Sequence, residues 1–147
     1  MAFTGNYTCN VFRTGLLDGV YDFGTGTTDV FKIALYTNAA TLDATTTAYT
    51  ATGEVVASGY TAGGEILVIN QVPTTGNAPN TTAYLSFANA SWTGAFTARG
   101  ALIYKYDGAG NPAVCVLDFG ADKTVSNDTF QIIFPTADAN SAIVRIS

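Results

Sequence analysis

The feature that most constrains the fold of this chain is a series of short runs rich in β-branched and aromatic residues. Such residues fit the pleated surface of a sheet, and here they are separated by segments with the composition of turns, among them PTTGNAPN and GADKTVSND. No helical pattern lies between the runs. We therefore predict an all-β fold, an antiparallel, jelly-roll-like β-sandwich of about eight strands. The predicted strands are Val30–Tyr36, Glu54–Ala57, Glu65–Asn70, Ala83–Phe87, Ala101–Tyr106, Ala113–Phe119, Thr129–Phe134 and Ala142–Ile146.

A helical pattern of some length occurs only near the start of the chain. Apolar residues recur at helical spacing from Val11 to Val20, and Gly19 is suited to ending the helix. We predict a single domain over 1–147 with a short helical segment over 5–20. The apolar stripe of this segment can pack either on the domain's own sheet or on a neighbouring molecule, and the sequence leaves both alternatives open.

The stretch GEVVASGYTAGGEIL, from Gly53 to Leu67, places a group of glycines between two predicted strands. It matches neither common glycine-rich phosphate-binding pattern, and no helix is predicted after it. Glycine tolerates positive φ where a chain must change direction. We interpret the segment as a corner of the fold that the ring of Tyr60 covers.

The balance of charge limits the partners of this chain. Charged residues make up only 12% of the sequence, and the net charge is −5. A surface built mainly from Thr, Ser, Asn and Gly loses little when a neighbour covers it, because few charges must be desolvated. We predict an assembly subunit that forms homo-oligomers. The negative charge disfavours nucleic acid, and the absence of a long apolar run or a signal peptide predicts synthesis in a cytosol with no membrane partner.

The chain contains no histidine, which removes the commonest general base and the usual catalytic triads. Three acidic residues, Asp118, Asp122 and Asp128, surround one predicted turn, whereas a carboxylate pair for hydrolysis must face across a cleft. The same acids suit either a calcium site or a polar turn. We predict a protein that is not an enzyme, with no catalytic residue, metal or cofactor.

A few side chains are candidates for contacts with a partner. Trp92 can be a core residue, a subunit contact or a platform for a sugar, and Arg99 can bind a partner's carboxylate or an acid of its own chain. Tyr49, Tyr60 and Asn77 are further candidates, since they lie in loops or turns.

Larger contact regions are the loops Thr41–Thr52 and Pro73–Asn80 together with the N-terminal helix. Loops of this length in a compact domain are often functional or mobile. The alternative is that both loops are solvent-exposed turns. The two cysteines, Cys9 and Cys115, are expected as thiols in a cytosolic protein, with a disulfide as the less favoured alternative.

Several segments resemble a group of small structural proteins encoded in the genomes of tailed bacteriophages. They are LLDGVYDF, FKIALYTNAATLDATTTAYT, GEVVASGYTAGGEIL and SWTGAFTARGALIY with AVCVLDFGADKT, within Leu16–Phe134. The resemblance implies a non-enzymatic, β-rich virion protein made in the bacterial cytoplasm. Its partner would be the major capsid protein, as for a capsid cement or decoration protein, or another virion protein. A tail or tail-fibre component, either an adaptor or a receptor- and glycan-binding tip, is the alternative.

Overall fold

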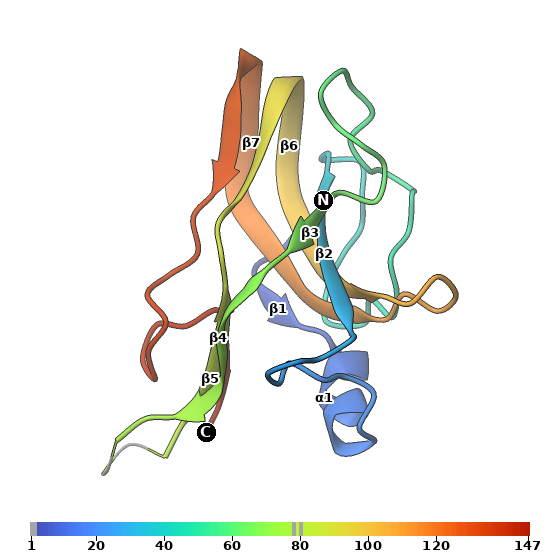
Figure 1. The fold of residues 1–147 in the computed structure, drawn as a ribbon. Helices are drawn as coiled ribbons and strands as arrows, with labels where there is room; N and C mark the ends of the chain where they lie inside the picture. The colour runs from blue at the N-terminus through green and yellow to red at the C-terminus, as the bar shows by residue number, and fades with distance from the viewer. Residues whose placement is uncertain (1–2, 78, 80) are drawn as a thin grey trace.

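The structure is a computed structural model that describes residues 3–77, 79 and 81–147 (Figure 1). These residues form eight strands and one short helix, which confirms the predicted all-β, sandwich-like fold. In chain order the elements are β1 (Tyr7–Thr8), α1 (Asn10–Leu17), β2 (Val30–Tyr36), β3 (Glu65–Leu67), β4 (Ile69–Thr75), β5 (Ala83–Phe87), β6 (Ala90–Tyr106), β7 (Ala113–Ile132) and β8 (Val144–Ile146).

The strands form two antiparallel sheets. The larger sheet has the order β1-β7-β6-β2-β3, and the smaller sheet has the order β4-β5-β8. The sheets meet through aromatic residues: the ring of Phe31 on β2 lies 6.2 Å from that of Phe87 on β5, and Phe23 stacks on Phe31 at 4.3 Å. Burying a large apolar side chain contributes roughly 2 kcal/mol, so this aromatic contact is a major part of what holds the two sheets together.

The centre of the larger sheet is one long hairpin made by β6 and β7. The two strands pair from Ala90↔Ile132 to Tyr104↔Ala113, and both fold back over themselves at the upper end of the view in Figure 1. The pairing shifts register between Gly94 and Phe96 and again between Ala98 and Gly100. Bulges of this kind increase local twist and bend a ladder without ending it.

The structure differs from two expectations from the sequence. The predicted strands Ala101–Tyr106 and Ala113–Phe119 are parts of β6 and β7, and the predicted strand Thr129–Phe134 covers the last part of β7, which ends at Ile132. The segment GADKTVSND lies within β7. The turn-forming residues of this segment do adopt the positive φ that is typical of turns, with values of 76° at Gly120 and 53° at Asn127. They mark where the long strand bends. The predicted strand Glu54–Ala57 is also wrong, since the structure has only an isolated bridge between Tyr36 and Glu54 there.

The helix α1 is shorter than the expected segment 5–20, which also contains β1. It ends at Asp18, just before Gly19, as the sequence predicted. Phe12 is buried and its ring lies 5.0 Å from that of Tyr21, so the apolar stripe packs on the domain itself. Leu17, in contrast, is 91% exposed. Within the described residues no helix has both the length and the apolarity to cross a membrane.

Candidate contact surface

The corner at GYTAGG is organised around one buried carboxylate, that of Glu54. Tyr49 Oη donates a hydrogen bond to Glu54 Oε2 at 2.6 Å, and Tyr60 Oη donates to Oε1 at 2.7 Å. The backbone N–H of Gly63 donates to the same Oε1 at 2.7 Å. The residue is only 6% exposed, so each of these bonds satisfies a group that water reaches poorly.

The tyrosines of this corner are held in their neutral form. Burial, followed by the hydrogen bond to Glu54, raises the pKa of Tyr49 to about 12. The same two causes, in the same order, raise the pKa of Tyr60 well above its ordinary value. Both hydroxyls therefore remain donors at neutral pH, and both are engaged inside the molecule. Neither Tyr49 nor Tyr60 presents its hydroxyl to a partner.

The glycines of the corner are required by close packing. Gly64 has a φ of +73°, and a β-carbon there would lie 1.8 Å from the carbonyl oxygen of Ile33 on β2. Gly59 lies equally close to β6, since a β-carbon there would be 2.1 Å from the carbonyl oxygen of Thr93. Only glycine combines this backbone conformation with so close a contact. The segment is thus a corner wedged against two strands of the larger sheet.

Trp92 lies in the core, one of the alternatives that the sequence left open. It is 3% exposed, and its ring packs 6.1 Å from Phe130 and 6.4 Å from Tyr60. Its indole Nε1 is buried without a hydrogen-bond partner among the described residues. A ring so enclosed offers no face on which a sugar could stack.

Arg99 pairs within its own chain. Its Nε lies 3.1 Å from Asp118 Oδ1, and both side chains are mostly shielded from solvent. Asp118 lies opposite Gly100 and Asp128 lies opposite Gly94, at separate places along the hairpin. Nowhere in the described ranges do three or more potential ligands gather into a group that could hold a metal ion.

The two loops expected as contact arms differ from each other. The backbone of Thr41–Thr52 is tied to its surroundings: Ala44 O accepts from Asn10 N, and Thr47 O accepts from Ala113 N. Asn77, by contrast, is exposed in the connection between β4 and β5. Part of the second loop, at positions 78 and 80, lies outside the described residues.

Both cysteines are buried free thiols. Thr8 is paired with Cys115, and Cys9 N donates to Val114 O. Cys9 therefore lies one residue beyond the pair of Thr8 with Cys115, at the start of α1. Burial, the largest cause, raises the pKa of Cys9 to about 11, and it also raises the pKa of Cys115.

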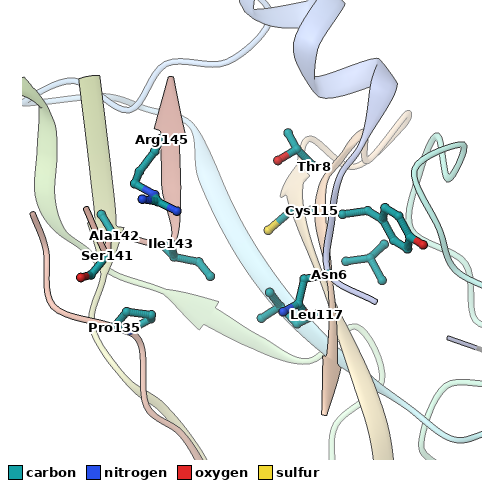
Figure 2. Close-up of a pocket in the computed structure, with 11 residues that line it drawn as sticks. Asn6, Thr8, Cys115, Leu117, Pro135, Ser141, Ala142, Ile143 and Arg145 are labelled. Atoms are coloured by element: carbon teal, nitrogen blue, oxygen red, sulfur yellow. The ribbon is translucent and has the colours of Figure 1, made fainter. Parts of the chain in front are cut away.

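A surface that the sequence did not predict lies where α1 meets β8. We call it the arginine-rimmed groove, a depression of about 460 Å³ whose lining includes Phe12, Arg13, Leu16, Leu17, Arg145 and Ile146. A second pocket, of about 260 Å³, adjoins it and shares Thr8 and Arg145. Figure 2 shows Arg145 and Ile143 on one wall of this pocket, facing Thr8 and Cys115 on the other.

The groove could not be found from sequence spacing because its residues come from the two ends of the chain. A partial signal existed in α1, where Leu16 and Leu17 are adjacent and only one of two neighbours can lie on the inner face of a helix. Comparison with known proteins gave no match to a family model, to a curated protein or to a solved structure.

Proposed function

We propose that this chain is a non-enzymatic structural protein of a tailed-bacteriophage virion, a capsid decoration protein that binds the major capsid protein and stabilises the head. One observation carries the proposal: an unusually apolar set of side chains remains on the surface. Leu17, Val56, Ile66, Val68 and Ile133 are each more than 60% exposed. A partner that covers these side chains removes apolar area from water, which favours association.

The rest of the surface supports the same proposal. Charged residues are few, and exposed threonines pair across the long hairpin, with 2.7 Å between the hydroxyl oxygens of Thr97 and Thr124. Neutral hydroxyl groups of this kind cost less to desolvate than charged groups when a neighbour covers them. A capsid lattice offers many identical places, so contacts that are weak singly act together through avidity.

The setting of the proposal comes from the resemblance to phage structural proteins. A subunit present in many copies on a capsid is expected to be a homo-oligomer about a symmetry axis. Its partner is a virion protein, since a net charge of −5 opposes binding to the phosphates of DNA. The function requires no cofactor.

The test compares phage heads that contain the protein with heads that lack it. A protein that binds only the assembled lattice stabilises that lattice by mass action. We expect heads without it to release DNA at a lower temperature than complete heads and to leak in low salt where complete heads do not, and adding the purified protein should restore them. Heads that behave identically with and without the protein would contradict the proposal.

A further inference from the structure

The arginine-rimmed groove continues into the neighbouring pockets to form one long depression. Phe12, Leu16, Val144 and Ile146 line both the groove and an apolar pocket of about 110 Å³ that reaches the smaller sheet. On its other side the groove shares Thr8 and Arg145 with the pocket in Figure 2. The depression therefore runs from β4 and β5, past α1 and β8, to the edge of β1.

The middle of this depression is apolar and open to solvent. Leu17 and Ile146 stand at its rim with 91% and 54% of their surfaces exposed, while Phe12 at its base is buried. An unfilled apolar channel with exposed leucine and isoleucine at its rim gains stability when apolar side chains of a partner fill it.

The charge of the depression is opposite to that of the whole chain. The chain has eleven acidic residues against six lysines and arginines, yet Arg13 and Arg145 are the charged side chains that line these three pockets in the described structure. The ion pairs found among the described residues use Arg99 and Lys105 instead.

Both arginines have donors available for a partner. Arg145 donates one hydrogen bond to the carbonyl of Asn140. The pKa of Asp138 is lowered mainly by hydrogen bonds from the backbone of Asn140 and Ser141, and the charge of Arg145 adds to this effect. A guanidinium has five N–H donors, and most of those on Arg145 have no acceptor among the described residues. In the described part of the chain Arg13 has no ion pair.

We propose that this groove binds a segment of a different protein that presents apolar side chains together with carboxylates. The apolar side chains enter between α1 and β8, and the carboxylates accept hydrogen bonds from Arg13 and Arg145. A second copy docked through the same face is disfavoured, because a two-fold contact brings the same arginine-rich surfaces together.

The experiment uses the purified chain and two fluorescein-labelled peptides of the same pattern, one built from leucine and glutamate and one built from leucine and lysine. Binding is measured by fluorescence anisotropy, and its place by protection of backbone amides from hydrogen exchange. We expect saturable binding of the glutamate peptide, about ten-fold tighter than that of the lysine peptide. Protection should appear over residues 12–17 and 144–146.

The decisive variant carries Arg13→Glu and Arg145→Glu, and it should bind the lysine peptide more tightly than the glutamate peptide. Lys123→Glu is the matched control, because Lys123 is an exposed cation on β7 and does not line the depression. It should retain the wild-type preference. A second double variant, with Arg13→Gln and Arg145→Gln, removes both charges without reversing them. Urea unfolding of every variant separates loss of binding from loss of folding.

Five results would overturn the proposal, four of which concern the peptides. These four are failure of the glutamate peptide to bind, equal binding of the two peptides, an unchanged preference in the folded double variant, and protection at another surface. Protection of 12–17 and 144–146 that rises with protein concentration in the absence of peptide would identify a second copy as the occupant, which also contradicts the proposal.

Discussion

The hydroxyl of Tyr60 donates a hydrogen bond to Glu54 Oε1 at 2.7 Å and accepts one from the backbone N–H of Leu35 at 2.9 Å. One side chain thus joins the glycine-rich corner to a buried carboxylate and to β2. The corner is therefore fixed to the central strands, which gives the surface around it a defined shape before any partner binds.

Removing the carboxylate of Glu54 should destabilise the fold strongly. Glu54→Ala leaves the hydroxyls of Tyr49 and Tyr60 and the N–H of Gly63 without their acceptor, and we expect a loss of about 3 kcal/mol in the free energy of unfolding. Urea unfolding measures it. Glu65→Ala, at an exposed glutamate, is the control and should change stability by less than about 0.5 kcal/mol. Equal losses of stability in the two variants would show that the hydrogen bonds to Glu54 do not stabilise the fold.

Two glycines with similar backbone angles should respond very differently to alanine. Gly64 and Gly108 have φ values of +73° and +77°, but a β-carbon meets the Ile33 carbonyl at Gly64 and nothing within 4 Å at Gly108. Gly108→Ala should cost about 1 kcal/mol from backbone strain alone. Gly64→Ala should cost more than about 3 kcal/mol or prevent folding. Similar melting temperatures for the two variants would contradict the close approach of the corner to β2.

Stability should fall in alkaline solution. Burial raises the pKa of Cys9 from 9.0 to about 11 and those of Tyr21 and Tyr49 from 10.0 to about 12. A raised pKa means that the folded state holds the proton more tightly, so the stabilisation is complete below the unfolded pKa and is lost as pH rises through the folded value.

We therefore expect the urea midpoint to decline from about pH 9 upward, with Cys9 alone accounting for roughly 2 kcal/mol once the pH exceeds its folded pKa. The tyrosinate absorbance that comes from the buried tyrosines, recorded in parallel, should rise only as the protein unfolds. The variant Tyr21→Phe should show a shallower decline, because it lacks one of these groups. Ionisation of the buried tyrosines in a protein of unchanged stability would contradict the burial that we describe.

The exposed leucine of α1 should matter for binding and not for folding. Leu17→Ser removes a side chain that is 91% exposed, so the free energy of unfolding should change by less than about 0.5 kcal/mol. Binding to heads should weaken. Phe12→Ala, at the buried base of the same helix, should instead cost about 3–5 kcal/mol. If Leu17→Ser binds heads as well as the wild type does, this part of the surface is not a contact.

Much of the fold could be predicted from the sequence where local pattern and final structure agree. β2 and β5 begin and end where their runs of strand-forming residues do, at Val30–Tyr36 and Ala83–Phe87. The continuity of β6 and β7 could not be predicted, because Gly94, Gly100 and Asn127 are typical of chain reversal. Cross-strand pairing keeps the ladder intact through these positions, and only the bends remain.

The candidate contact residues could be predicted from the sequence less well than the strands, because tertiary structure decides which of them are exposed. The sequence makes Trp92 and Tyr60 candidate contacts because they are aromatic residues near turns, but the fold encloses the first and uses the hydroxyl of the second internally. From the sequence, Glu54 is an ordinary residue of a predicted strand. Arg13 and Arg145 become neighbours of one groove only because β1 and β8 bring the ends of the chain together.

The role in the capsid is tested most directly by adding gold-labelled protein to phage particles that lack the protein and imaging where the gold binds. We expect gold in a regular lattice over the head, with the positions defining the symmetry axis that the protein occupies. Gold confined to the tail would contradict a capsid decoration protein and favour a tail component. Particles that bind no gold would contradict a role in the virion.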